Sequence, residues 1–377
     1  MIYLDYNATV PLRPAAKAAM LAALEVCGNA SSIHAVGRRA RGVVEEARTK
    51  VAALVGVDPR SVIFTSSGTE ANAMVLRGVT GVTRILISTI EHDSVRANAR
   101  AIAESMPCVE LQEIPVTASG VLDVDALRVL LTNGKGRALI SVMAANNETG
   151  VVQPIEAIAK LAKDHGALLH VDAVQAAGRI ALGFDADYLT LSAHKLGGPQ
   201  GAGALIVKDD APFVPLIAGG GQELNRRAGT ENVAAIAAFG AAAEAAKDFA
   251  AENARLAALR DGFEAKLKAL TLDAVIFGAN AQRLTNTSNF AIPGLAAEAA
   301  IIALDLDGVA ISSGAACSSG KVGRSHVLKA MDVDDELAVC GLRVSFGWAS
   351  TEQDVDAAIA SLKTHLDRKG ARARAAA

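Results

Sequence analysis

The sequence predicts an α/β protein whose larger part is a mostly parallel, doubly wound sheet of about seven strands. Short apolar runs, such as VIFT at 62–65 and RILIST at 84–89, alternate with helical stretches. Polar residues recur where these runs end. The carboxyl ends of parallel strands form the edge at which such a sheet binds its ligand. We therefore expect a ligand site at that edge.

The composition favours an enzyme that acts on small molecules in the cytoplasm. The chain has 377 residues, of which 51% are hydrophobic, enough for a large core and two domains. A net charge of −3 gives no reason to expect nucleic acid or an anionic membrane. The amino terminus lacks a signal-peptide pattern, and charged residues interrupt the Ala-rich stretch 233–251. The four cysteines lie far apart without CxxC spacing, which predicts reduced thiols in the cytoplasm.

The first elements are a short strand at Ile2–Leu4, a helix at Pro14–Leu24 and a second helix that ends near Val55. Between the helices, Asn29–His34 is polar, so we expect a loop that reaches toward a ligand. His34 is more simply explained as a local cap. Further along, Ser66–Thr69 precedes a helix, and the amides at a helix start suit a phosphate. An ordinary helix cap explains that turn equally well.

Lys195 lies between a strand at Tyr188–Leu191 and a glycine-rich turn. A lysine that is partly buried at such an edge can form a Schiff base with a carbonyl cofactor. Asp172 ends the preceding apolar run, and Gln175 follows it. A carboxylate near the lysine suits pyridoxal phosphate, because the ring nitrogen needs an acidic partner. Alone, Lys195 would be a solvated lysine and Asp172 a helix cap, but together they favour the cofactor.

Other polar residues follow neighbouring strands. His92 comes after the strand at 84–89, and we expect its ring to lie against the cofactor, although a lone histidine is more often structural. Asn146 and Asn147 end the run ALISVMAANN. Beyond residue 207, a glycine- and arginine-rich loop at 216–232 is long enough to reach another subunit.

Two helical stretches to about residue 270 are interpreted as a connector between domains. The predicted division is a large domain at 14–255 and a small α+β domain formed by 1–13 and 256–377. The small domain carries Cys317, whose Ser-, Gly- and Lys-containing surroundings favour a thiolate. A small residue in a tight turn is an equal alternative. Arg343 is a single charge in the apolar strand LRVSF, so it should face a carboxylate of a substrate or of the protein.

A set of segments resembles the cysteine desulfurases, in the class V branch of fold-type I pyridoxal phosphate enzymes. They occur in order along nearly the whole chain: LDYNATVP, FTSSGTEANA, EHDSV, NNETGVVQP, HVDAVQAAG, SAHKLGGPQGAGAL, RRAGTEN, SSGAAC and LRVSFG. The resemblance implies a fold-type I transferase. One departure is Leu224-Asn225, which replaces the family's Arg-Gly in the loop expected at the subunit interface.

The resemblance also implies roles for single residues. Lys195 would carry pyridoxal 5'-phosphate, Asp172 would pair with the ring nitrogen, and Gln175 would contact the ring hydroxyl. His92 would stack on the ring and act in catalysis with Lys195 and Cys317. The residues implied to hold the phosphate are Gly68, Thr69, Ser192, His194 and, from the other subunit of a homodimer, Thr230. Those implied to bind the substrate are Asn29, Asn147 and Arg343, with Asn147 also at the cofactor.

The implied reaction removes sulfur from L-cysteine and leaves L-alanine and a persulfide on Cys317. Sulfur would then pass to an acceptor or scaffold protein, for example in iron-sulfur cluster assembly. No metal site is expected in the chain, and Cys317 is the residue that would contact an iron-sulfur cluster of a partner. The alternatives are a selenocysteine lyase or a class V aminotransferase. A cofactor-binding scaffold without turnover would need neither Lys195 nor Cys317.

Overall fold

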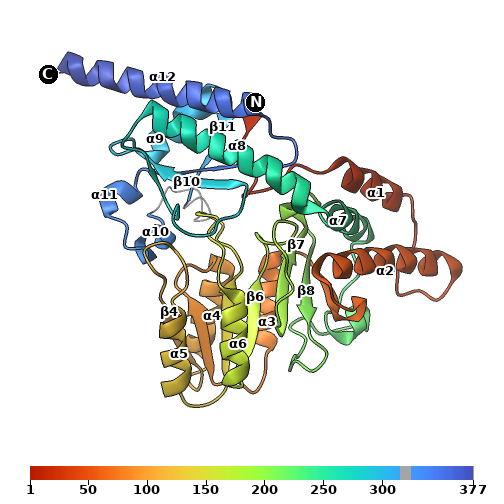
Figure 1. Cartoon of the computed structure of the whole chain (residues 1–377). Coiled ribbons are helices and arrows are strands. Elements are labelled where there is room, and N and C mark those ends of the chain that lie inside the picture. The colour runs from red at the N-terminus through yellow and green to blue at the C-terminus, as the bar shows by residue number, and fades with distance from the viewer. Residues whose placement is uncertain (315–323, 377) are drawn as a thin grey trace.

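A seven-stranded sheet forms the centre of the larger part of the molecule (Figure 1). The structure, a computed structural model, describes residues 1–314 and 324–376, with side chains as far as residue 368. The strand order is β2-β8-β7-β6-β5-β3-β4. Only β8 among these strands runs against the others, which confirms the predicted, mostly parallel sheet. The strands are β2 (Val62–Thr65), β3 (Arg84–Ser88), β4 (Glu110–Ile114), β5 (Ala138–Met143), β6 (Leu168–Asp172), β7 (Tyr188–Ser192) and β8 (Gly203–Val207).

Helices cover both faces of this sheet, because successive strand residues point to opposite sides. On β3, Leu86 lies in the buried cluster that includes α5 and α6, whereas Ile85 and Ile87 pack with α3 and α4. Figure 1 shows α5 and α6 in front of the sheet. The helices of this part are α1 (Pro14–Leu24), α2 (Ala35–Val55), α3 (Gly68–Gly78), α4 (Asp93–Ser105), α5 (Val124–Asn133), α6 (Ile155–Asp164) and α7 (Val233–Ala245).

The first helix begins and ends where the sequence predicts, and the second ends where predicted but begins at Ala35, inside the segment 27–42 that is interpreted as preceding it. α1 spans the expected residues, with Pro14 in its first turn. α2 ends at Val55 and is followed by Gly56, whose φ of 72° is a left-handed conformation that glycine adopts without steric cost. His34 caps the start of α2, since its Nδ1 accepts a hydrogen bond from the Gly37 amide at 3.2 Å. Local capping by His34 is thereby confirmed.

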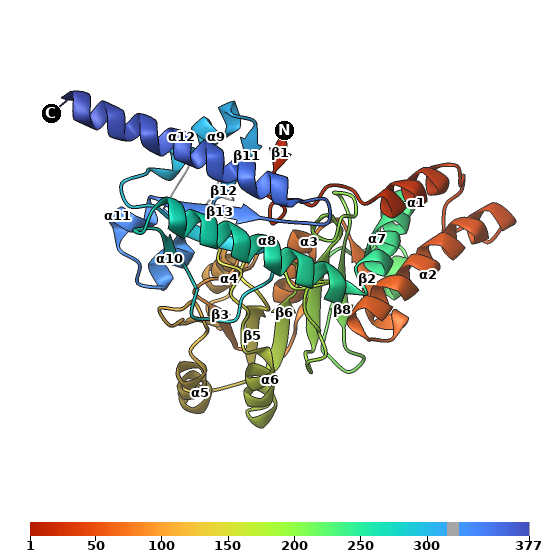
Figure 2. The ribbon, with the colours of Figure 1, turned by 45° about the horizontal axis from the view of Figure 1, so that its top comes forward.

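The second part of the molecule is built on a four-stranded antiparallel sheet in the order β12-β13-β10-β9. Its strands are β9 (Val275–Ile276), β10 (Thr287–Ala291), β12 (Ser312–Ser313) and β13 (Gly341–Ser345), and a parallel pair joins β1 (Ile2–Tyr3) to β11 (Val309–Ala310). Its helices are α8 (Phe249–Leu270), α9 (Ala297–Leu306), α10 (His326–Ala330), α11 (Asp335–Ala338) and α12 (Glu352–Ala376). Figure 2 shows α8 and α12 side by side. Their core centres on Phe263, whose ring lies 5.4 Å from that of Phe290.

The two helices interpreted as a connector each belong to a hydrophobic core. α7 packs against α1 and α2, and its residues Ile236 and Phe239 are buried there. α8 places Leu256, Leu259 and Phe263 in the core beside α12. Three residues, 246–248, separate the two helices, and the chain passes from the first core at Ala246 to the second at Leu256. The division at residues 255 and 256 stays a prediction.

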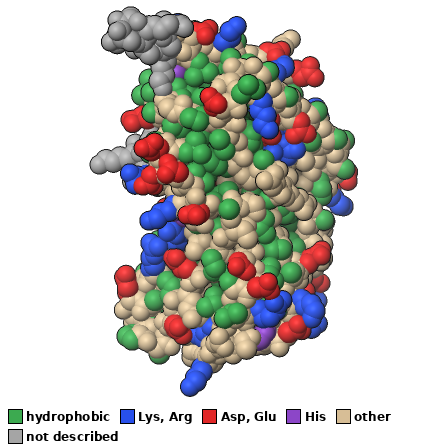
Figure 3. Space-filling view, turned by 60° about the vertical axis from the view of Figure 1, so that its left-hand side comes forward, with side chains coloured by type: hydrophobic (Ala, Val, Ile, Leu, Met, Phe, Trp, Pro, Cys, Tyr) green, Lys and Arg blue, Asp and Glu red, His purple; other side chains and the backbone are tan. Residues whose placement is uncertain are grey.

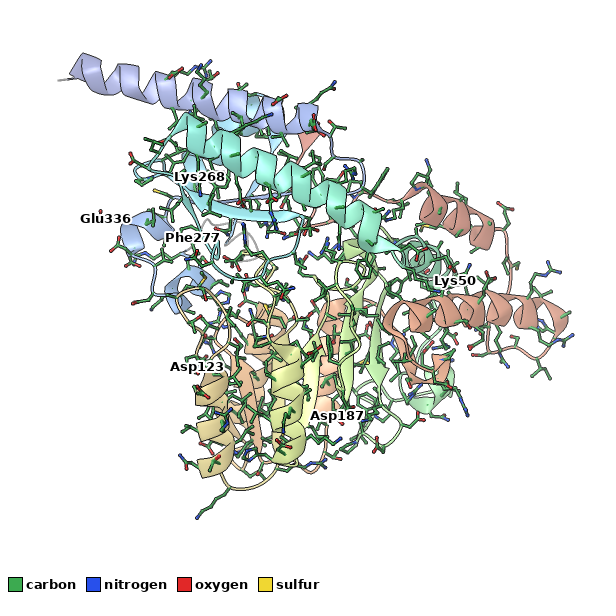
Figure 4. All side chains as sticks on the ribbon, in the orientation of Figure 1. Lys50, Asp123, Asp187, Lys268, Phe277 and Glu336 are labelled. Carbon is green, nitrogen blue, oxygen red and sulfur yellow. The ribbon has the colours of Figure 1, made fainter. Side chains whose placement is uncertain are left out.

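The edge of the seven-stranded sheet at which we expect a ligand faces the part of the molecule that contains the four-stranded sheet (Figure 1). Asp187, which precedes β7, lies at the opposite end of the large sheet (Figure 4). Acidic and basic side chains are interspersed on the face shown in Figure 3, in keeping with the small net charge. Within the described residues, no helix is both long and apolar enough to cross a membrane.

Candidate active site

A cavity of about 330 Å³ opens at the carboxyl ends of β5, β6 and β7. The starts of α3 and α4, the turn after β1 and Arg343 of β13 complete it. It brings together most of the expected site residues: Gly68, Thr69, His92, Asn147, Asp172, Gln175, Ser192, His194, Lys195 and Arg343. Asn29 and Thr230 are exposed and do not line it in this chain. Cys317 lies outside the described residues.

Lys195 closes the short 3-10 turn η2 (Ala193–Lys195) that follows β7. Its Nζ donates hydrogen bonds to the carbonyl oxygens of Asn7 at 2.5 Å and Ala8 at 2.8 Å. The turn after β1 thus holds the amine within the cavity that Asp172 also lines. The sequence suggested no role for Asn7, because its contact with Lys195 spans 188 residues.

Asp172 is the last residue of β6 and is 6% exposed. Its Oδ2 accepts a hydrogen bond from Asn72 Nδ2 at 2.7 Å, and its Oδ1 accepts one from the Val174 amide at 3.0 Å. These two donors stabilise a carboxylate and fix its orientation. No helix lies in the described stretch that follows β6, residues 173–187, so the alternative interpretation of Asp172 as a helix cap is wrong. Its carboxylate instead orders the turn after the strand and lines the cavity.

His170 lies two residues before Asp172 on the same face of β6 and is fully buried. Its Nδ1 is 2.8 Å from Ser141 Oγ, and its Nε2 is 3.0 Å from Thr190 Oγ1. Burial lowers the pKa of His170 to about 4, so the imidazole is neutral at pH 7. A neutral ring therefore links β6 to β5 and β7, two residues before Asp172.

His92 caps the start of α4 as well as lining the cavity. Its Nδ1 accepts a hydrogen bond from the Ser94 amide at 3.0 Å. Because Nδ1 accepts that proton, the proton of a neutral His92 ring is on Nε2. The structural explanation for this histidine is confirmed, and its position in the cavity leaves the stacking role as a compatible prediction.

The start of α3 forms an anion cradle together with the end of β7. The first amides of a helix have no partner within the helix, and Ser67 caps only the Glu70 amide, at 3.1 Å. A Cβ on Gly68 would lie 2.9 Å from Val174 Cγ2, so glycine is needed for this close approach. Ser192 Oγ is buried and lacks a hydrogen-bond partner among the described residues. Such a hydroxyl is suited to a phosphate oxygen.

Two further side chains are held beside the lysine. Burial, and then the charge of Lys195, lowers the pKa of His194 to about 4. Gln175 donates from Nε2 to the Asn7 carbonyl at 2.9 Å, and its Oε1 accepts from Arg179 Nη1 at 2.9 Å. Arg179 thereby fixes which way the amide of Gln175 points. Sequence reasoning missed Arg179, because a single arginine in a turn carries no pattern.

Arg343 is 3% exposed and does face a carboxylate, that of Asp5. Its Nη2 donates to Asp5 Oδ1 at 2.6 Å, and its Nη1 donates to the Asn147 carbonyl at 2.8 Å. Of the two partners that the sequence left open, the structure therefore supplies the protein's own carboxylate. Arg343 Nε has no hydrogen-bond partner among the described residues.

The cavity fits pyridoxal 5'-phosphate by its chemistry. Lys195 supplies the amine, Asp172 the carboxylate, and the start of α3 with the unpartnered Ser192 hydroxyl the phosphate cradle. An acid, an amine and an anion site around one cavity are the groups that this cofactor requires.

Comparisons with known proteins agree with this chemistry. The profile of the class-V aminotransferases matches residues 2–358. A protein of Dictyoglomus turgidum described as cysteine desulfurase IscS is 40% identical, with 97% of this chain and 95% of that protein aligned. An IscS-like cysteine desulfurase of Mycobacterium tuberculosis is 39% identical over 100% of this chain and 99% of its own length.

A solved structure of a NifS-like protein from Rickettsia africae superposes with a TM-score of 0.88 at 36% identity, covering 97% of this chain and 99% of that one. The chain therefore belongs to the class-V aminotransferase family and, within it, to the cysteine desulfurases. Enzymes of this family depend on pyridoxal 5'-phosphate.

Proposed function

We propose that this protein removes sulfur from L-cysteine, giving L-alanine and a persulfide on Cys317. The observation that carries the proposal is the convergence of Lys195, Asp172 and the phosphate cradle in one cavity with a buried arginine, Arg343. The full-length similarity to cysteine desulfurases supports it. Bound pyridoxal phosphate would supply the electron sink that makes the α-carbon of the amino acid acidic.

The remaining steps are substrate binding, proton transfer and stabilisation of the cofactor's charge, and each is assigned to residues of this chain. Arg343 binds the α-carboxylate of cysteine, and Asp5 and Asn147 hold its guanidinium in place. Lys195 Nζ takes the α-proton and later returns a proton to the carbon skeleton. Asp172, fixed by Asn72, would supply the negative charge that keeps the ring nitrogen of the bound cofactor protonated.

The sulfur step itself belongs to Cys317. Its thiolate attacks the substrate sulfur, so that an S–S bond forms while the C–S bond breaks. The electron pair of the C–S bond remains with the carbon fragment, which takes up a proton and leaves as alanine. The persulfide then transfers its outer sulfur to an acceptor or scaffold protein, such as one that assembles iron-sulfur clusters.

Product analysis of the cofactor-loaded protein tests this function. With L-cysteine alone, we expect L-alanine and, with a reductant, sulfide in equal amounts. Lys195→Ala should change the visible absorbance of the bound cofactor and abolish alanine formation. Amino-group transfer from cysteine to a keto acid without sulfide would instead identify an aminotransferase, and turnover of selenocysteine but not cysteine would identify a lyase.

We also propose that the protein is a cytoplasmic homodimer in which Thr230 completes the phosphate site of the partner. Thr230 is exposed on a loop that also exposes Leu216 and Leu224. The loop is anchored by Glu223, which is 5% exposed and receives a hydrogen bond from Arg48 at 2.6 Å. Leu224 has a φ of 56°, which is a costly backbone conformation for a residue with a side chain. The contact between Glu223 and Arg48 holds the loop in this conformation.

Subunit exchange tests the shared site. A mixture of Lys195→Ala and Thr230→Glu chains forms hybrid dimers with one intact site if Thr230 acts on the partner. Random pairing should then restore about a quarter of the wild-type activity. If Thr230 acts within its own chain, the hybrids have no intact site and activity stays absent. A monomer in sedimentation would also overturn the proposal.

A further inference from the structure

A buried carboxyl group lies between the two described ends of the segment 315–323. Glu148 follows β5 and is 3% exposed. Its Oε2 accepts a hydrogen bond from Ser325 Oγ at 2.5 Å. A Cβ placed on Gly314 would lie only 2.3 Å from the same oxygen. Gly314 is the last described residue before that segment, and Ser325 is the second described residue after it. Glu148 therefore lies close to the described chain on both sides of the segment.

Glu148 is itself held firmly. Its amide donates to Asn146 Oδ1 at 2.9 Å, and its carbonyl accepts from Asn289 Nδ2 at 3.2 Å. On the other side, Ser325 Oγ accepts from the Leu328 amide at 3.1 Å and so caps α10. The carboxyl group thus joins a fixed turn of the large sheet to the start of a helix in the other part of the molecule.

The same turn holds the arginine that would bind substrate. The carbonyl of Asn147, the residue before Glu148, accepts a hydrogen bond from Arg343. Arg343 also pairs in register with Ser312, two residues before Gly314. The position of Arg343 and the ends of the segment are therefore set by neighbouring residues of one turn.

We propose that Glu148 is a positioning residue that fixes Gly314 and Ser325 relative to Arg343. The segment between them carries Cys317, and the inference rests on the proposed role of that thiol. Misplacing a reacting group by about 1 Å can lower a rate on the order of 100-fold. Glu148 would thus govern the sulfur step without touching the substrate.

Substitutions at two positions test the contact. Burial raises the pKa of Glu148 and favours its neutral form, so Glu148→Gln is the conservative variant and should stay within a few-fold of wild type. Glu148→Ala should lower kcat for alanine formation roughly 10- to 100-fold, with a much smaller change in KM. Gly314→Ala should do the same, because the new methyl group displaces the carboxyl. The double variant Glu148→Ala/Gly314→Ala should be no worse than Glu148→Ala, since the clash is gone.

Hydrogen exchange provides a readout that does not need turnover. In Glu148→Ala, peptides covering 312–314 and 324–330 should exchange faster, including the Leu328 amide, while β6 stays protected. Glu156→Ala, on the exposed side of α6, is the matched control and should change neither measurement.

Two results would overturn the proposal. One is an unchanged kcat and unchanged exchange in Glu148→Ala, and the other is independent, multiplicative losses in the double variant. If Glu148→Ala does not fold, Gly314→Ala decides, because its methyl group must displace the Glu148 carboxyl. A lowered kcat with faster exchange in the same peptides would support the proposal, and wild-type values for both would overturn it. If the wild type forms no alanine, the proposed function fails, and the exchange data still decide whether Glu148 fixes the two ends.

Discussion

Removing the charge of Asp5 should expose how strongly Arg343 depends on its counter-ion. Asp5→Asn keeps the size of the side chain and one oxygen acceptor, but it removes the charge that forms an ion pair with the guanidinium, which is 3% exposed. A hydrogen bond to a charged group contributes about 1.5–3 kcal/mol. The free energy of unfolding of the cofactor-loaded protein should fall by about that amount.

A carboxylate ligand should restore part of this loss. L-Alanine, as the product, places its carboxylate near Arg343 if the proposed binding mode is correct. In urea denaturation, saturating L-alanine should therefore stabilise Asp5→Asn more than it stabilises the wild type. Asp58→Asn, which removes an exposed partner of Arg60, should change stability by less than about 0.5 kcal/mol. Equal stability of Asp5→Asn and wild type, or an equal effect of L-alanine on both, would refute this reasoning.

Two other predictions concern side chains beneath the cavity. Burial lowers the pKa of His170 from its ordinary 6.5 to about 4 in the folded protein. Its contribution to stability is therefore complete above pH 6.5 and is lost as the pH falls toward 4. The loss is on the order of 3 kcal/mol. In His170→Asn, the free energy of unfolding should therefore fall less between pH 6.5 and 4, by about this amount. Parallel curves of unfolding free energy against pH for the two proteins would contradict the prediction. Arg179→Met should free the Gln175 amide to rotate, because it removes the hydrogen bond that orients that amide. The affinity for pyridoxal phosphate should then fall about tenfold. Titration of the cofactor, followed by fluorescence, measures this affinity, and an unchanged value would rule out the orienting role.

Much of the fold was predictable because its signals are local. Apolar runs mark every strand of the large sheet except the edge strand β4, whose sequence ELQEI carries no such signal. The polar residues that follow the parallel runs mark the ligand edge. Asp172 and Lys195 were identifiable for this reason. Arg343 was identifiable because a charge in an apolar strand demands a partner.

The missed residues act through contacts between distant parts of the chain. Asn72 lies within α3 and reaches Asp172 across 100 residues, and Asp5 meets Arg343 across 338. Glu148 stood in the quoted motif NNETGVVQP without a role, since its partners Gly314 and Ser325 come from the other part of the molecule. A buried amide or acid in an apolar neighbourhood is a signal for such a contact, but it does not identify the partner.

The measurement that tests the central claim most directly is the location of the transferred sulfur. The cofactor-loaded protein is mixed briefly with L-cysteine, alkylated, digested and analysed by mass spectrometry. One additional sulfur should appear on the peptide that carries Cys317, and Cys317→Ser should retain the cofactor while losing alanine formation by several orders of magnitude. Cys27→Ser and Cys108→Ser, which replace exposed cysteines, should behave as wild type. Sulfur on Cys27 or Cys108, or alanine formation by Cys317→Ser at nearly the wild-type rate, would contradict the account.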